Sequence, residues 1–388
     1  MELTEKDYAM WLFNVESIGN ASMDKLLCSG LSCKDVYQLS SKELSKVLSH
    51  KQVENIERSR HSWDFENEKN KLLSKGIRFV SRIDEDFPEK LKNIPNAPFA
   101  IYVKGKLPDP NIPSVAVIGA RMCSDYGRFM ARQFGRDLAI AGIQVISGMA
   151  RGVDGIAQGA AVAAGGASFG VLGCGVDICY PPENKEIYDA LSLNGGLISE
   201  FPPGMEPVAK FFPMRNRIIS ALADAIVVVE ARRKSGTTIT VDTALEQGRE
   251  VFAVPGRASD RLSDGCNYLI SQGAGVAISA ADVLDRLWSM RGRYEEPDLE
   301  QANRSDEEQP GTFCQYQEEE MDVLPKEIPI EQEILEIVDI IPVSSSFILE
   351  ELYKKGKEIS VPRLLTVLME LTYSGKIAQN GAYYRKIA

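Results

Sequence analysis

A series of short apolar runs, separated by helix-like stretches, constrains the fold of this chain more than any other feature. The runs are VAVIG, IQVIS, FGVLG, GLIS, AIVVVE, EVFAVPG and GVAIS, and all lie between residues 115 and 279. Continuous apolar strands that alternate with helices are typical of a parallel sheet with both faces covered. Two further strand-like runs around a proline-rich turn precede them from residue 76. We therefore expect an α/β domain over residues 76–288.

The segments on either side of this domain have different patterns. Helical periodicity over residues 1–70 predicts a small helical domain, in which ESIGNASMDKLL has the glycine turn of a helix-hairpin-helix module. Residues 289–325 are acidic and poor in aliphatic side chains, which is typical of a flexible linker. Residues 326–388 show three helical patterns and then strand–turn–strand, which is the order of a winged helix.

Composition limits the class of protein. The chain has 388 residues, 44% of them hydrophobic and 26% charged, as expected of a globular protein with two or three domains. The sequence opens without a basic segment followed by an apolar run, and no run of about eighteen apolar residues occurs. We therefore expect a cytoplasmic protein that does not enter a membrane. The seven cysteines form no CxxC pair and are interpreted as reduced thiols, most of them buried.

Histidine content and charge narrow the chemistry further. The two histidines, His50 and His61, both precede the glycine-rich region, which therefore cannot build a Ser/His/Asp triad or a histidine metal site from its own residues. We predict no catalytic residue, no metal and no cofactor. The net charge of −11 argues against a uniformly basic surface, so nucleic-acid binding would depend on local clusters.

The turn formed by Gly119, Ala120 and Arg121 follows an apolar strand and precedes a helix. Backbone N–H groups and the positive end of the helix dipole make such a turn a candidate anion site. The dinucleotide fingerprint is absent, because Arg121 stands where its second glycine allows a pyrophosphate to approach the backbone. Taken alone, this turn is equally compatible with a purely structural role.

Three further glycine turns follow predicted strands, in residues 147–161, 172–184 and 232–249. They come at the carboxyl ends of the strands, which is the edge where open α/β sheets bind ligands. Several anion sites along one edge favour a polyanion as the ligand. The candidate binding residues in these turns are Ser147, Gly148, Gly173, Ser235, Gly236, Thr237 and Thr238.

The segment VAKFFPMRNRIIS, residues 208–220, places cations beside aromatic rings. Single-stranded nucleic acid is bound in this way, because cations contact phosphates while rings stack on unpaired bases. The candidate residues are Lys210, Arg215 and Arg217 as cations, Phe211 and Phe212 as rings, and Asn216 as an amide that contacts a base. The alternative is that the rings belong to the core and the arginines form ion pairs with Asp224 or Glu230.

These motifs, in this order, resemble the DNA-processing protein A family, also called Smf. The similar blocks include AVIGAR, SGMARGVDGIAQ, LGCGVDICYPPEN, FFPMRNRIIS and SGTTITVDTALEQGREVFAVPG, and together they cover essentially the whole central domain. The resemblance implies an extended Rossmann domain that binds single-stranded DNA without cleaving it and forms a homodimer. It also implies that the protein protects incoming DNA and loads the RecA recombinase onto it during natural transformation.

The resemblance also implies roles for individual residues. The motif arginine of the family falls on Arg121, and the pocket positions fall on Phe212, Arg215 and Arg217. The pocket lysine has no exact counterpart at the family's offset, and Lys210, two residues before Phe212, is the candidate. The helical N-terminal segment would correspond to a sterile-alpha-motif-like or helix-hairpin-helix domain, and the C-terminal segment to the family's winged helix.

Two other functions compete with this interpretation. Phosphoribohydrolases of the lysine-decarboxylase-like group carry a PGGxGTxxE motif with a catalytic glutamate, whereas here the third residue after Thr237 is Thr240. Asp242 or Glu246 would have to act from another face of the helix. A sequence-specific transcription factor is the other alternative, but the C-terminal segment has few basic residues, in YKKGK and YYRK.

Overall fold

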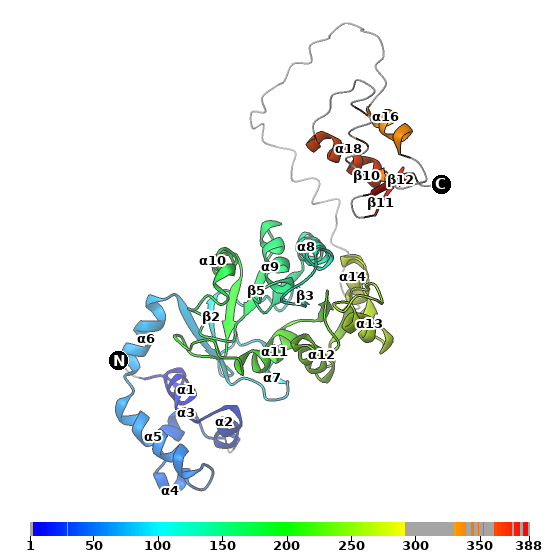
Figure 1. Cartoon of the computed structure of the whole chain (residues 1–388). Coiled ribbons are helices and arrows are strands. Elements are labelled where there is room, and N and C mark those ends of the chain that lie inside the picture. The colour runs from blue at the N-terminus through cyan, green and yellow to red at the C-terminus, as the bar shows by residue number, and fades with distance from the viewer. Residues whose placement is uncertain are drawn as a thin grey trace. The chain divides into compact units, whose positions relative to one another are not determined.

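The computed structural model describes residues 3–28, 30–291, 330–338, 343–344, 348, 352, 361–374, 376–380 and 383–386. It divides into two compact units, Met1–Leu299 and Glu300–Ala388, and each is described here by itself (Figure 1). Most of the predicted acidic linker lies outside the described residues, and its first three positions belong to the last helix of the first unit.

Six helices begin the first unit, and serine, threonine or aspartate precedes five of them. Capping boxes begin four of these helices, at Thr4, Ser32, Ser40 and Ser49, and the Asp64 carboxylate caps a fifth. The helices are α1 (Glu5–Asn14), α2 (Asn20–Leu27), α3 (Cys33–Gln38), α4 (Ser41–Leu44), α5 (His50–Ser62) and α6 (Phe65–Ser74).

The core beneath these helices is shared with the sheet. Trp11 of α1 is fully buried in one cluster with Phe79 and Tyr102, which belong to the first two strands. The indole N–H of Trp11 donates to Ser59 Oγ at 3.0 Å, so the one polar group of this side chain is satisfied. The helices therefore cover one end of the sheet, beside β1 and β2 (Figure 1).

Nine strands form one sheet in the order β1-β2-β6-β5-β4-β3-β7-β8-β9. Strands β1, β2 and β6 pair antiparallel, and all pairs from β6 to β9 are parallel, so the expected α/β fold with an extended Rossmann-like parallel sheet is confirmed. The strands are β1 (Ile77–Ser81), β2 (Ala100–Gly105), β3 (Ser114–Ile118), β4 (Gln144–Ser147), β5 (Ser168–Val171), β6 (Gly196–Ser199), β7 (Ala225–Val228), β8 (Glu250–Ala253) and β9 (Gly275–Val276).

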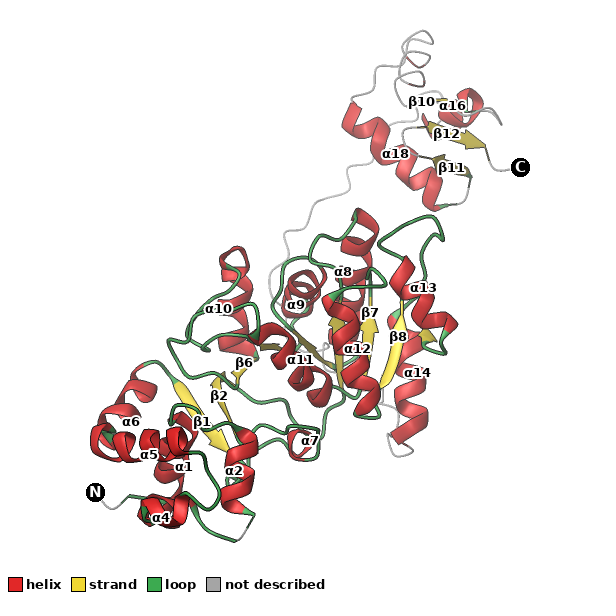
Figure 2. Cartoon of the chain, turned by 60° about the horizontal axis from the view of Figure 1, so that its bottom comes forward, coloured by secondary structure: helices red, strands yellow, loops and turns green. Residues whose placement is uncertain are grey.

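Helices cover both faces of the parallel part of the sheet (Figure 2). Successive residues of a strand point to opposite faces, so Val115 and Val117 of β3 pack into one core and Ala116 and Ile118 into the other. The helices are α7 (Glu89–Lys92), α8 (Asp125–Ile140), α9 (Val153–Ala163), α10 (Lys185–Asn194), α11 (Phe211–Leu222), α12 (Gly236–Glu246), α13 (Asp264–Ser271) and α14 (Ala280–Arg291), with a short 3-10 helix at Pro182–Asn184.

The strand order reverses at β3, and a ligand site is expected at this position of the sheet. Strand β3 pairs with β4 on one side and with β7 on the other, so the connections after β3 and β7 leave the sheet in opposite directions. In open parallel sheets a crevice opens outside the carboxyl ends of the strands at such a point. The turns after β3 and β7 therefore meet at one ligand-accessible edge.

The described part of the second unit contains α16 (Ile330–Ile337), β10 (Val343–Ser344), α18 (Val361–Tyr373), β11 (Ile377–Asn380) and β12 (Tyr383–Lys386). The strands pair antiparallel in the order β10-β12-β11 and share a core with Ile334, Leu352 and Leu368. The winged helix stays a prediction for this segment. Among the residues that the structure describes, no helix is both long and apolar enough to cross a membrane.

Candidate nucleic-acid interface

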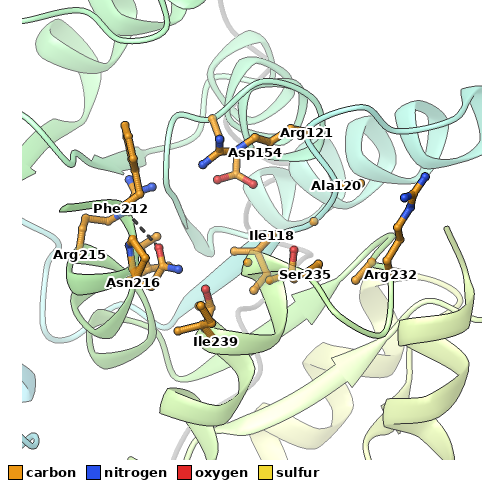
Figure 3. Close-up of a pocket in the computed structure, with 18 of the residues that line it drawn as sticks. Ile118, Ala120, Arg121, Asp154, Phe212, Arg215, Asn216, Arg232, Ser235 and Ile239 are labelled. Atoms are coloured by element: carbon orange, nitrogen blue, oxygen red, sulfur yellow. Dashed lines mark hydrogen bonds between the residues drawn. The ribbon is translucent and has the colours of Figure 1, made fainter. Parts of the chain in front are cut away.

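A cavity of about 700 Å³ lies at the crevice outside β3 and β7. It is lined by the turn after β3, the start of α11 and the loop between β7 and α12 (Figure 3). Nine of the residues predicted from the sequence line it: Gly119, Ala120, Arg121, Phe212, Arg215, Asn216, Ser235, Gly236 and Thr237. Residues that sequence reasoning missed also line it, namely Met122, Asp154, Tyr180, Arg232 and Thr240.

The turn after β3 is held closely between two neighbouring segments. The Ala120 N–H donates to the carbonyl oxygen of Glu230 at 2.7 Å, and the Ala120 carbonyl accepts from the Val153 N–H at 3.2 Å. A Cβ on Gly119 would lie 2.8 Å from Val153 Cγ2, so this position requires glycine. The turn is rigid, and the exposed side chain of Arg121 stands at its tip.

At the start of α8, where the sequence predicted an anion site, a carboxylate of the protein contacts the residue that caps the helix. Glu230 is 1% exposed, and its carboxylate accepts from the Ser124 N–H at 2.9 Å and from Ser124 Oγ at 2.5 Å. The Ser124 hydroxyl in turn accepts from the Gly127 N–H at 3.1 Å. An internal carboxylate therefore compensates the positive end of α8, and the exposed side chain of Arg121 is the cation at this turn that can contact an anion.

The start of α12 differs, because it is open toward the cavity. Ser235, Gly236 and Thr237 line the cavity, and a Cβ on Gly236 would meet no atom within 4 Å. Ser235 Oγ is buried and has no hydrogen-bond partner among the residues described. Thr238 turns away, since its hydroxyl donates to the Arg233 carbonyl at 3.4 Å. Helix α12 therefore presents its N-terminal N–H groups toward the cavity.

Two aromatic rings and a guanidinium form one wall. The ring centroids of Tyr180 and Phe212 are 5.6 Å apart, with an interplanar angle of 32°. The guanidinium carbon of Arg121 lies 5.5 Å from the centroid of the Phe212 ring. A Cβ on Gly173 would come within 2.8 Å of Phe212 Cδ1, so the absence of a side chain at Gly173 leaves room for the Phe212 ring. Tyr180 lies within the glycine-rich segment predicted at residues 172–184, which was the signal available in the sequence.

Arg215 forms the floor of the cavity. It is 5% exposed, and its Nη1 donates to the carbonyl of Gly148 at 2.7 Å and to that of Val171. Its Nε contacts Asn216 Oδ1 at 3.3 Å (Figure 3). Burial lowers the pKa of Arg215 to about 10, although the charge of Asp154 opposes the shift. Arg215 thus ties the ends of β4 and β5 to α11.

Asp154 is the carboxylate next to this arginine. It accepts from the Gly148 N–H at 3.1 Å and lies in the first turn of α9. Burial raises the pKa of Asp154, and the positive charge of Arg215 partly offsets that rise. Gly148 lies between the two groups, since a Cβ there would be 2.6 Å from Arg215 Nη2 and 2.8 Å from Asp154 Oδ2.

Six predicted residues lie outside the cavity lining, namely Ser147, Gly148, Gly173, Lys210, Arg217 and Thr238. Arg217 is 8% exposed and donates to both Glu200 carboxylate oxygens at 2.7 and 2.8 Å, so its partner is neither Asp224 nor Glu230. Ser147 is buried and donates to the Val117 carbonyl at 2.6 Å. Lys210 is exposed one residue before α11, with its ammonium 5.2 Å from the centroid of the Phe211 ring.

The family profile described as DNA recombination-mediator protein A matches residues 78–288. The chain belongs to this family. The DNA processing protein DprA of Streptococcus pneumoniae is 40% identical over 208 residues, which cover 53% of this chain and 72% of that protein. The Smf protein of a Synechocystis species is 31% identical over 293 residues, which cover 74% of each chain.

Two solved structures from the same family are similar to this one. The X-ray structure of DprA from Streptococcus pneumoniae aligns with a TM-score of 0.64 and 33% identity, over 74% of this chain and 98% of that chain. The structure of DNA processing protein A from Helicobacter pylori aligns with a TM-score of 0.50 and 26% identity, over 57% of this chain and 99% of that chain. Its title concerns a single-stranded DNA binding mode. All residues that line the cavity fall inside the segment matched to the family.

The buried pair of Asp154 and Arg215 generates a stability prediction. Asp154→Asn keeps the shape of the side chain but removes the negative charge nearest to a buried guanidinium. We expect the free energy of unfolding, measured by urea denaturation, to fall by about 3 kcal/mol. Arg151→Gln is the control, because it breaks an exposed pair with Glu183 and should cost only about 0–1 kcal/mol. Equal losses in the two variants would contradict the assigned role of Asp154.

Proposed function

We propose that the cavity binds single-stranded DNA. The observation that carries this proposal is the wall made by Tyr180, Phe212 and Arg121, in which two rings and a free guanidinium face one cavity. Aromatic faces stack on unpaired bases of any sequence, and a guanidinium beside them contacts the phosphate. The open start of α12 and the exposed Arg232 supply further positive potential on the opposite side.

The DNA is proposed to be single-stranded because stacking on Phe212 requires a base with one face that no neighbouring base covers. In a duplex both faces of each base are covered by its neighbours, so a half-buried ring on a cavity wall has no surface to contact. The Helicobacter pylori protein, a member of this family, is described as having a single-stranded DNA binding mode, which supports the same choice.

The wider role is proposed from the family. A protein that holds single strands through a small cavity leaves most of each strand accessible to a recombinase. We propose that it protects incoming DNA in the cytoplasm and loads RecA onto it during natural transformation. The cavity is proposed to bind and not to catalyse. Thr240 lines it close to the turn where a phosphoribohydrolase needs glutamate, whereas Asp242 and Glu246 do not line it.

A homodimer is proposed at the β9 edge of the sheet. Strand β9 ends the sheet, and Val276 and Ile278 beside it are 44% and 66% exposed. The sequence alone also suggests Leu269 and Ile270 of α13 as contact positions, but both are partly buried against the core, so the more exposed Ile278 is the position chosen for the test. An uncovered strand edge with apolar side chains is a surface that a second copy can cover, and two cavities in one dimer could share a strand.

Arg121→Ala tests the phosphate contact. The plot of log affinity for single-stranded DNA against log salt concentration should become shallower by about 0.7, the value for one lost phosphate contact. Arg78→Ala is the control, because Arg78 is an exposed residue of β1 that does not line the cavity and forms an ion pair with Asp86. A salt dependence equal to that of the unchanged protein would remove Arg121 from the site.

Phe212→Ala tests base stacking. Binding of single strands should weaken by about 1–3 kcal/mol, while the melting temperature stays close to that of the unchanged protein. Phe211→Ala is the matched control, because Phe211 stacks on Phe201 at 4.2 Å and does not line the cavity. Loss of thermal stability with intact binding would instead make Phe212 a core residue.

Ile278→Arg tests the dimer. A charge at this exposed position should yield monomers in light scattering, with lower apparent affinity for long single strands. Ile140→Arg is the control, because Ile140 is 69% exposed on α8 and has no proposed partner at the sheet edge. Dimers that persist in the Ile278 variant would contradict the proposed interface.

A further inference from the structure

A strip of exposed apolar side chains runs from the cavity onto α8. Met122, which lines the cavity, is 84% exposed, and Tyr126 and Phe129 on α8 are 44% and 59% exposed. Phe129 is the most exposed aromatic side chain in the described part of the chain. Tyr126 and Phe129 are three residues apart, so they lie on adjacent parts of one helix face. Apolar side chains gathered in this way mark a binding surface.

Two arginines lie among these side chains. Arg128 and Arg132 are both exposed and four residues apart, one turn of the helix. The nearest carboxylate to Arg128 is Asp125 at 3.9 Å, a weak exposed contact, and no ion pair of Arg132 is recorded within the described residues. The segment MCSDYGRFMARQ contains one acid and two arginines in a chain whose net charge is −11. Two arginines against one aspartate leave this segment with a net charge of +1, on a protein whose net charge is −11.

The strip continues the wall of the cavity. The Phe212 ring lies near both Tyr180 and the Arg121 guanidinium, and Met122, which follows Arg121 in the sequence, also lines the cavity. The Tyr126 hydroxyl donates to the Pro255 carbonyl at 2.9 Å, which holds this ring in place beside the helix. The first turns of α8, from Asp125 to Arg132, then extend the surface by about 10 Å.

We propose that the outer strip, Met122, Tyr126, Arg128, Phe129 and Arg132, carries the single strand onward as it leaves the cavity. The inference rests on the proposed function of the cavity. Methionine, aromatic rings and arginine are also common at protein interfaces, so the choice of a single strand rests on position: Met122 lines the cavity, and rings and cations alternate along the chain from there, as bases and phosphates do along a strand. Two or three nucleotides beyond the cavity would stack on Tyr126 and Phe129 while Arg128 and Arg132 contact their phosphates.

The test compares oligothymidylates of two lengths, about 4 and about 16 nucleotides, of which only the longer reaches the strip. Phe129→Ala should weaken binding of the longer strand roughly fivefold to tenfold and leave the shorter one unaffected. Arg132→Gln should lower the salt dependence by about 0.7 for the longer strand alone. Leu245→Ala is the matched control, because Leu245 has the same 59% exposure but lies on α12. Both substituted side chains of the strip are exposed, so the variants should fold normally.

The outcomes separate this inference from the proposed function. If the unchanged protein binds neither strand, the proposed function fails and the strip fails with it. If it binds both, but Phe129→Ala and Leu245→Ala behave alike on the longer strand, the strip lies off the path while binding by the cavity stands. A changed mass in light scattering for Phe129→Ala, with unchanged binding of the longer strand, would show a protein contact and overturn the proposal.

Discussion

The buried guanidinium of Arg215 is the interaction on which the geometry of the cavity depends. It donates to the backbone at Gly148, after β4, and at Val171, the last residue of β5, and Asp154 compensates its charge. Because Arg215 belongs to the first turns of α11, the same bonds fix where that helix begins. Phe212, three residues earlier on that helix, is thereby held against Gly173 with its other side toward the cavity. The position of the Phe212 ring on the cavity wall therefore depends on the buried charge of Arg215.

The two helix starts near the cavity differ for a physical reason. The start of α8 receives the carboxylate of Glu230, which accepts from the N–H and the hydroxyl of the capping residue Ser124 and opposes the helix dipole there. The start of α12 receives no such group, and Ser235 Oγ remains without a partner among the described residues. Under the proposed function, an anion in the cavity would lie between the α12 start and Arg121, with the bases toward Phe212.

The fold could be predicted from local sequence, whereas parts of the site could not. Each apolar run contains a strand, because its period and length depend on neighbouring residues alone, and all of these strands except the short edge strand β9 are largely buried. Glu230 and Ser124, in contrast, are 106 positions apart, so no local pattern indicates that the first fills the anion site beside the second. The ion pair of Arg217 with Glu200 is likewise not indicated by local sequence, because the run FFPMRNR contains two arginines and gives no sign that Glu200 lies beside the second. The cavity residues Arg121 and Phe212 were predictable because their turns repeat a family motif.

The central claim is that the cavity retains single-stranded DNA intact, and one measurement tests it most directly. Fluorescence anisotropy would compare a labelled single strand with the matching duplex at one salt concentration, and the recovered strand would then be analysed for released bases. The account predicts tighter binding of the single strand, together with full recovery of the intact oligonucleotide. Equal or tighter binding of the duplex, or release of free base, would contradict it.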